Sequence, residues 1–279
     1  MTTTLSSSPT WAAECDLLQC IDCGQDLEPA GDDLRCSSCG RNYPIRDGFL
    51  DTLDPLTGNN KVAADFYNGP LWPKFRFWEW LAFLFNGGER RARHKVLQHL
   101  TNLSGTRFLE VAVGDGANIP YLPEDCAFYG IDISIVQMTQ CRQRFHQRDL
   151  RLLLGEAEKL PFKDRTFDNA LSLGAFNYFN DPVQGLKEMA RVVKPGGQVV
   201  VCDEVPNLPN YLIGRYIGLP QLDRWVMAKF MNLGYEFTDM AERYRDLKLE
   251  PIVDEALSDW QIHMIWGRMA YCIVGKPKV

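Results

Sequence analysis

The chain has 279 residues, of which 46% are hydrophobic and 24% charged, and its formal net charge is −6. This composition is ordinary for a globular protein, and the length allows one large domain with a smaller one beside it. The acidic balance argues against a general nucleic-acid binder, which needs a cationic face for phosphates, but it leaves room for a local basic patch.

Residues 1–14 are polar, lack the apolar core of a signal peptide and are expected to form a disordered tail. The sequence contains no run of about 18 apolar residues, so no helix that crosses a membrane is predicted. We therefore expect a cytoplasmic protein without a transmembrane segment.

Residues 15–53 contain two CxxC pairs, Cys20 with Cys23 and Cys36 with Cys39. Four thiolates at this spacing can surround a zinc ion tetrahedrally, which leaves no open position for catalysis. A segment this short cannot build a stable core by itself, so we expect a small zinc ribbon held by structural Zn²⁺. Four unrelated free cysteines are the alternative.

Residues 54–62 have the composition of a linker, and residues 63–100 are expected to be helical, in two parts divided at Asn86-Gly-Gly. The first part is crowded with aromatic side chains, which either complete a core or form an apolar wall over a site. A solvated helix face, or contact with an acidic headgroup or phosphate, is expected for the basic residues that follow, Arg90, Arg91, Arg93 and Lys95.

Residues 101–279 alternate between short apolar segments and amphipathic ones. The strand candidates are Phe108–Val113, Ala127–Ile131, Leu150–Leu154, Asn169–Leu173, Gln198–Cys202 and Met269–Val274. Helical patterns lie between them at Ile135–Phe145 and Pro182–Val193. This alternation predicts an α/β fold, with a mostly parallel sheet covered by helices on both faces. Residues 206–244 interrupt it as an apolar, helix-like insert.

The first predicted strand contains Glu110 and leads into the turn Gly114-Asp-Gly116, and Asp132 follows the second. Glycines let a backbone approach a ligand, and a carboxylate can accept hydrogen bonds from ribose hydroxyls. The carboxyl ends of neighbouring strands meet at one edge of an open α/β sheet, where ligands bind. The sequence therefore predicts a pocket for a nucleoside-bearing cofactor. A nicotinamide-binding domain is the competing interpretation.

Further segments narrow the choice of cofactor. The ordered motifs are Glu110, Gly114-Asp-Gly116, Asp132, Glu156-Ala-Glu-Lys-Leu-Pro-Phe162, Phe167-Asp168 and Lys194-Pro-Gly-Gly197. In combination they resemble class I S-adenosylmethionine-dependent methyltransferases, and most closely the branch of the quinone-biosynthesis enzymes. The resemblance covers roughly residues 107–202. It implies S-adenosylmethionine as cofactor and a doubly wound, mostly parallel seven-stranded sheet of the Rossmann-like kind.

The cofactor ligands that this resemblance implies are Glu110, Gly114, Asp115, Gly116, Asp132, Ile133, Glu156, Ala157, Leu173 and Gly174. Glu110 and Gly114–Gly116 would hold the methionine end. Asp132 would bind the ribose hydroxyls, and Ile133 would pack on adenine. Glu156 and Ala157 would meet the adenine edge, and Leu173 and Gly174 would lie beside the sulfonium. This chain departs from the family twice, with Ala112 in place of the usual first glycine and Glu156 in place of the usual aspartate.

In that family the position of residues 206–244 caps the acceptor pocket, so the apolar insert implies a small apolar or aromatic acceptor. A helix pair that completes the core or forms a dimer is the alternative, and we expect a monomer or homodimer. Methyl transfer needs a base only where the acceptor must lose a proton. For that role we expect Tyr178 and Glu204, and the alternatives are Asn177, Asp203 and His263.

The segment 43–50, after the second CxxC pair, resembles the zinc ribbon of the activators of tRNA and protein methyltransferases. A fused ribbon precedes the methyltransferase domain in several bacterial and plastid proteins, and a related one occurs in some ribosomal-RNA methyltransferases. O- or C-methylation of a small acceptor is the favoured function. The alternatives are an RNA methyltransferase that docks RNA through its ribbon and a non-catalytic cofactor-binding protein.

Overall fold

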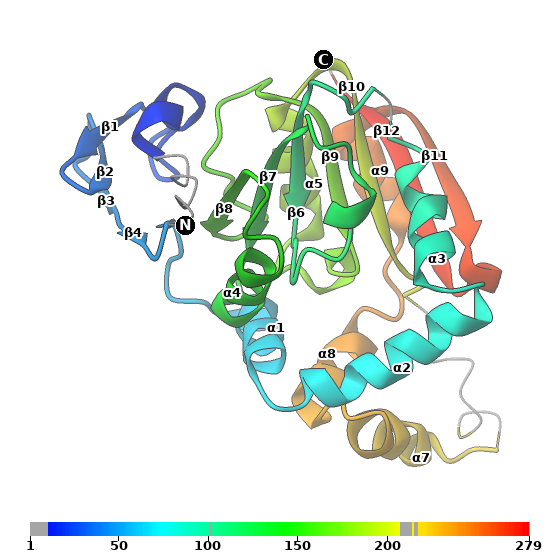
Figure 1. The fold of residues 1–279 in the computed structure, drawn as a ribbon. Coiled ribbons are helices and arrows are strands. Elements are labelled where there is room, and N and C mark those ends of the chain that lie inside the picture. Colours follow the sequence, from blue (N-terminus) through cyan, green and yellow to red (C-terminus); the bar gives the residue numbers. More distant parts are fainter. Residues whose placement is uncertain (1–10, 101, 207–213, 215–216, 279) are drawn as a thin grey trace, which may run out of the picture.

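The structure is a computed structural model that describes residues 11–100, 102–206, 214 and 217–278. Its central feature is a nine-stranded sheet in the order β11-β12-β10-β9-β6-β7-β8-β5-β4 (Figure 1). The strands are β4 Ile45–Arg46, β5 Phe49–Asp51, β6 Arg107–Val111, β7 Ala127–Asp132, β8 Leu150–Leu154, β9 Phe167–Leu173, β10 Val193–Glu204, β11 Leu257–Ile265 and β12 Ala270–Pro277.

The strands from β8 to β10 run parallel, whereas β12 is antiparallel to β10 and β11 is antiparallel to β12. Leu109 and Val111 of β6 belong to one buried cluster and Phe108 to the other, because successive side chains point to opposite faces. Burial on both faces makes these strands nearly continuous apolar runs, as parallel sheets require. The expected doubly wound, mostly parallel sheet is confirmed over the seven strands from β8 to β11.

Helices cover the two faces of the sheet. α5 (Pro182–Val192) and α9 (Leu249–Ala256) pack into the cluster on one face, and α3 (Glu89–Leu97) and α4 (Ile135–Arg144) into the cluster on the other. Side-chain caps fix two of the helix starts. Ser134 accepts a hydrogen bond from the Gln137 amide at α4, and Asp181 accepts one from the Gln184 amide at α5.

The N-terminal unit contains a three-stranded antiparallel sheet of β1 (Leu27–Ala30), β2 (Asp33–Cys36) and β3 (Asn42–Tyr43). Residues 45–51, which the sequence assigned to the ribbon, lie instead in the large sheet, where β5 pairs in parallel with β8. This pairing occupies backbone groups of β8 that would otherwise form an open sheet edge.

Two further segments differ from the expected boundaries. Residues 1–10 of the expected tail lie outside the described residues, but Trp11–Leu17 forms a 3-10 helix. The buried Trp11 indole anchors the start of this helix by donating a hydrogen bond to the Gly48 carbonyl at 3.2 Å. The helix α1 (Gly58–Asn68) begins inside the expected linker 54–62.

The aromatic segment continues as α2 (Trp72–Phe85). Gly87 and Gly88 interrupt the helical conformation before α3, with φ of 85° and 91°. In Figure 1, α1 and α2 gather with α7 (Pro220–Trp225) and α8 (Tyr235–Arg243) below the sheet, as a separate layer. The π-helical turn η5 (Val226–Phe230) joins this layer, which has its own apolar cluster. Residues 207–213 and 215–216 of the predicted cap lie outside the described residues. None of the helices in the described ranges combines the length and apolar content that a bilayer crossing requires.

Candidate functional site

A cavity of about 150 Å³ lies at the carboxyl ends of β6, β7 and β9, and we refer to it as the polar cavity. Most of the ligands expected from the sequence line it, namely Glu110, Gly114, Asp115, Asp132, Ile133, Ala157, Leu173 and Gly174. The two others, Gly116 and Glu156, lie outside its lining. The fold therefore brings residues from several strand ends into one site, as expected for an open α/β sheet.

Glu110, at the end of β6, is buried and held by a second buried side chain. Its Oε1 atom accepts a hydrogen bond of 2.6 Å from Asn118 Nδ2, whereas Oε2 has no partner among the described residues. Burial raises the pKa of Glu110 to about 7. A buried carboxylate oxygen that lines a cavity and lacks a donor fits the amino group of a ligand.

Arg93 of α3 supports this arrangement from behind. Its Nη1 atom donates a 2.9 Å hydrogen bond to Asn118 Oδ1, and its Nε atom donates one of 2.8 Å to Glu89. Arg93 is only 4% exposed, so the expectation that it lies on a solvated helix face was wrong. The physical reason is the buried Glu110, whose charge a nearby cation stabilises.

Asp132 fixes the glycine turn to the end of β7. One of its carboxylate oxygens accepts a 2.8 Å hydrogen bond from the Gly114 amide, and the other accepts one of 2.8 Å from the Ser134 amide. Burial raises its pKa to about 6. Gly116 has a structural part in the same turn, because a Cβ atom there would lie 2.7 Å from Cys141 Sγ.

Two helices of the outer layer reach the site with polar side chains. Arg76 of α2 makes an ion pair of 2.6 Å with Asp115 in the glycine turn. Asn60 of α1 donates a 2.7 Å hydrogen bond to the Glu156 carboxylate. Asn60 therefore occupies the carboxylate that the sequence assigned to the adenine edge, while the neighbouring Ala157 lines the polar cavity.

A second cavity of about 340 Å³ adjoins the first, and we refer to it as the apolar cavity. Aromatic and aliphatic side chains from α1, α2, η5, α8 and the turn between η5 and α8 dominate its lining, including Phe66, Phe75, Trp78, Phe83, Met227, Met231, Leu233 and Phe237. Of the two interpretations of the aromatic segment, an apolar wall therefore describes Phe66, Phe75, Trp78 and Phe83, which all belong to that segment. The two cavities share Tyr67, Trp72, Glu79, Leu173, Gly174 and Tyr178.

Two acidic residues at the end of β10 line the apolar cavity. The Tyr178 hydroxyl hydrogen-bonds the Glu204 carboxylate. Asp203 accepts 2.9 Å hydrogen bonds from the amides of Asn177 and Glu204, so its oxygens are engaged by the backbone. Burial raises the pKa of both carboxyl groups to about 7. Glu204 is therefore hydrogen-bonded to Tyr178, whose side chain lines both cavities.

His263 lies apart from this constellation. Its ring stacks on His99 at 4.7 Å between centroids, and it lines neither cavity. Among the candidates for a base, the structure brings Tyr178, Glu204, Asn177 and Asp203 to the apolar cavity and leaves this histidine outside.

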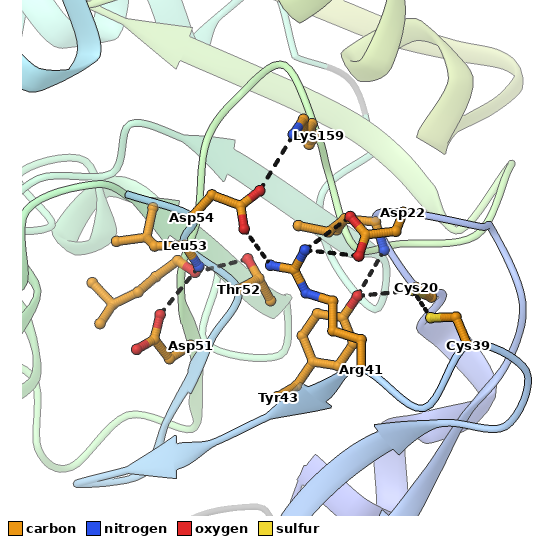
Figure 2. Close-up of polar contacts among 12 residues, drawn as sticks. Cys20, Asp22, Cys39, Arg41, Tyr43, Asp51, Thr52, Leu53, Asp54 and Lys159 are labelled. Carbon is orange, nitrogen blue, oxygen red and sulfur yellow. Dashed lines mark hydrogen bonds and ion pairs between the residues drawn. The ribbon is translucent and has the colours of Figure 1, made fainter. Parts of the chain in front are cut away.

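The four cysteine sulfurs of the CxxC pairs lie within 4.8 Å of one another. Each pair closes a tight turn, in which Gly24 and Gly40 have φ of 70° and 75°. Tyr43 braces the cluster, since its hydroxyl donates to Cys20 Sγ at 3.0 Å and accepts from the Ile21 amide at 2.9 Å (Figure 2). Four clustered sulfurs without nitrogen or oxygen ligands fit a tetrahedral zinc ion.

The N-terminal unit is joined to the loop that follows β8. Leu18 forms an isolated antiparallel bridge with Phe162, and the Gln19 amide donates to the Pro161 carbonyl at 2.9 Å. Nearby, Arg41 binds Asp22 and Asp54, and Lys159 reaches Asp54 from the loop, as the dashed lines in Figure 2 show. The loop that carries Ala157 into the polar cavity is therefore anchored on the cysteine-bearing unit.

The central part of the chain is similar to known proteins. Residues 109–201 match the family model described as "Methyltransferase domain". The matched residues run from β6 to β10 and include the strand ends that line the polar cavity.

Individual curated proteins are similar to about two fifths of this chain. The phthiotriol/phenolphthiotriol dimycocerosates methyltransferase 1 of Mycobacterium ulcerans is 32% identical over 117 residues, which cover 41% of this chain and 43% of that protein. The demethylmenaquinone methyltransferase of Corynebacterium kroppenstedtii is 38% identical over 122 residues, covering 43% and 51%. The chain spans about half of the length of such curated relatives.

Among solved structures, a SAM-dependent methyltransferase from Aquifex aeolicus aligns with a TM-score of 0.46 at 17% identity. The alignment covers 79% of this chain and 98% of that one.

Proposed function

We propose that this chain is an S-adenosylmethionine-dependent methyltransferase that methylates a small, apolar or aromatic acceptor at oxygen or carbon. The observation that carries the proposal is the junction of the polar and apolar cavities at Leu173, Gly174 and Tyr178. A charged nucleoside and an apolar acceptor need different surroundings, and here the two environments meet at one strand end.

The polar cavity has the side chains that such a cofactor requires. The free Oε2 atom of Glu110 matches a cationic amine, and Asp132 lies where ribose hydroxyls can reach its carboxylate. Gly174 has φ of 79° and open space where a Cβ would stand, so its backbone can approach a ligand closely. When bound, S-adenosylmethionine supplies an electrophilic methyl group on its sulfonium.

The apolar cavity supports the acceptor class. Its walls are mostly apolar, so an apolar molecule can bury its surface against them and be oriented by contact. Methyltransferases named for a menaquinone precursor and for phthiotriol lipids are among the relatives of this chain. We infer an acceptor of the same broad kind, with the methylated atom facing Gly174.

Glu204 and Tyr178 are our proposed proton acceptor and its relay. With a pKa near 7, Glu204 is partly ionised at neutral pH and can accept a proton from an acceptor hydroxyl or an activated carbon. The Tyr178 hydroxyl hydrogen-bonds Glu204, and its side chain lines both cavities. It either takes the proton of the acceptor while giving its own to Glu204, or orients the acceptor. The four cysteines of the N-terminal unit, in the same proposal, hold a structural Zn²⁺.

Calorimetric titration with S-adenosylmethionine tests the first half of this proposal. We expect saturable binding by the full chain, and a loss of at least about tenfold in Asp132→Ala, because buried charge-assisted hydrogen bonds each contribute more than 1 kcal/mol. The matched control is Glu124→Ala, which removes an exposed carboxylate outside the cavity lining. Equal affinity of all three proteins, or no binding at all, contradicts the proposal.

The acceptor class, the second half of the proposal, is tested by identifying the methylated product. The chain is incubated with methyl-labelled cofactor and separate polar, apolar and RNA fractions of a cell extract. Transfer of label to a small molecule in the apolar fraction supports the acceptor class. Label in RNA alone supports the alternative RNA methyltransferase, and cofactor binding without any transfer supports a non-catalytic role.

A further inference from the structure

One side of α2 is apolar and exposed. Phe77, Trp80, Leu84 and Phe85 lie on it, with Trp80 55% and Phe85 81% exposed. Other side chains of the same helix, Phe75, Trp78 and Phe83, line the apolar cavity. A helix that is apolar on both sides needs a partner on both, and within the described residues only one side has it.

This exposed apolar surface continues onto the neighbouring helices. Ring contacts run from Trp80 to Phe77 at 6.0 Å, from Phe77 to Trp78 at 5.5 Å, and from Trp78 to Phe230 of η5 at 4.9 Å. Phe230 is exposed, as is Trp225 at the end of α7. We call the exposed set Phe77, Trp80, Leu84, Phe85, Trp225 and Phe230 the aromatic face. Trp78 connects it to the apolar cavity.

The charges around the aromatic face are mostly cationic, although the whole chain is acidic. Lys74 on α2 and Lys229 on η5 are exposed, and Arg90 and Arg91 are exposed at the start of α3. The carboxylate of α2 is Glu79, which pairs with Arg76 at 3.7 Å, and that of α7 is the buried Asp223. At the start of α3, Glu89 pairs with Arg93 at 2.8 Å.

This combination selects one kind of partner. Tryptophan and phenylalanine beside lysine and arginine suit the boundary between the headgroups and acyl chains of an anionic bilayer. A two-fold dimer through the same surface would bring like charges of the two copies close together. The surface of a membrane therefore fits both the apolar centre and the cationic surroundings.

We propose that the aromatic face docks on an anionic membrane surface, peripherally, and that the apolar cavity receives its acceptor from that side. Ala82 marks the path, because it lines the cavity and is itself exposed. Docking does not depend on methyl transfer, whereas the delivery of an acceptor rests on the function proposed above.

Vesicle co-sedimentation of the full chain tests the docking. The vesicles are phosphatidylcholine alone, or phosphatidylcholine mixed with phosphatidylglycerol, each at low and high salt. We expect binding to the mixed vesicles that weakens at high salt, because screening reduces contacts with headgroups. The double variant Trp80→Ser/Phe85→Ser should need at least about tenfold more lipid. The control Tyr121→Ser, which removes an exposed aromatic side chain elsewhere, should bind like the unmodified chain.

The double variant is checked by circular dichroism and by cofactor titration. If it does not fold, Lys74→Glu/Lys229→Glu replaces it, and this pair should lose binding to mixed vesicles only. Failure of the unmodified chain to sediment with mixed vesicles overturns the proposal, as does equal binding by the variants. If the unmodified chain forms a dimer and does not bind vesicles, and Trp80→Ser/Phe85→Ser is monomeric, then the aromatic face binds a second copy of the chain and the membrane proposal is overturned. If the chain binds vesicles but does not bind S-adenosylmethionine, the docking proposal is supported and only the proposed function is contradicted.

Discussion

Asn118 links two buried ions, because its Nδ2 atom donates to Glu110 Oε1 at 2.6 Å while its Oδ1 atom accepts from Arg93 Nη1 at 2.9 Å. The amide thereby fixes one oxygen of Glu110 and leaves the other to face a ligand. It also brings the charge of a buried guanidinium close to the carboxylate without a direct ion pair.

Asn118→Ala should weaken both the fold and the cofactor site. Removing the amide leaves Glu110 Oε1 without its donor and Arg93 Nη1 without its acceptor, which costs about 1–3 kcal/mol of unfolding free energy. We also expect S-adenosylmethionine affinity to fall by about tenfold or more, since Glu110 loses its orientation. Urea unfolding and calorimetry measure the two effects. Asn42→Ala, which removes an exposed amide of the ribbon, serves as control, and similar behaviour of both variants contradicts the assigned role.

The stability of the ligand-free chain should fall as pH rises from about 4 to about 7. Burial raises the pKa of Glu110 to about 7 and that of Asp132 to about 6, whereas unfolded carboxyl groups titrate near about 4. In this window the folded chain binds more protons than the unfolded chain, so the unfolding free energy decreases with pH. Thermal melts across the window test this, and Glu110→Gln should flatten the slope.

Cofactor affinity should have the opposite dependence on pH. Above its pKa Glu110 is a carboxylate that attracts a cationic amine, so affinity should rise as pH increases through about 7. Calorimetry at several pH values measures this trend. An unchanged trend in Glu110→Gln would show that another group is responsible.

Ala112→Gly should stabilise the chain slightly. Ala112 has φ of 60°, in the left-handed region where a Cβ atom is strained. Glycine removes that strain but adds freedom to the unfolded chain, so we expect a net gain of up to about 1 kcal/mol. Denaturant unfolding measures it. Ala170→Gly, in the buried strand β9, should instead destabilise, and a loss of stability in both variants would contradict a strained Ala112.

Glu204→Gln should reduce turnover by about a hundredfold or more if the acceptor must lose a proton. Tyr178→Phe should have a smaller effect, because the carboxylate remains. Neither change should alter cofactor affinity by more than a few-fold. The dependence of kcat on pH at saturating S-adenosylmethionine is the decisive measurement, because the effect of Glu110 on cofactor binding no longer contributes there. Under that condition the limb near pH 7 should disappear in Glu204→Gln. Retention of that limb removes Glu204 from the proton transfer.

Removal of zinc by a chelator should weaken cofactor binding, although no cysteine of the cluster lines the polar cavity. The bridge from Leu18 to Phe162 ties the ribbon to the loop that carries Ala157, so loss of the metal loosens that loop. Metal analysis should find one zinc ion per chain, and Cys36→Ser should reproduce the effect of the chelator. Cys15→Ser is the control, and equal affinity with and without metal contradicts the coupling.

The sequence predicted those parts of the structure that depend on neighbours along the chain. The bounds of β8 match the predicted strand Leu150–Leu154, because an apolar run between turn residues marks a buried strand. The clustering of the four cysteine sulfurs followed from CxxC spacing in the same way.

Contacts between distant segments were not predictable from such patterns. Asn60 binds Glu156 across 96 residues, and nothing local distinguishes that asparagine from any other in a polar segment. Arg93 occupies an ordinary place in a basic helix, and only the position of Glu110 makes it a buried residue. β5 spans three residues, too few to display a period of two, so its place beside β8 was invisible.

The pairing of β5 with β8 has a consequence for assembly. Because both strands belong to one polypeptide, the local concentration of β5 at that position is fixed by the connecting chain and does not fall on dilution. A separate protein that offered its own strand there would compete against this tethered occupant. In this chain, therefore, the N-terminal unit is attached to the large sheet within one polypeptide, and no encounter between separate molecules is needed.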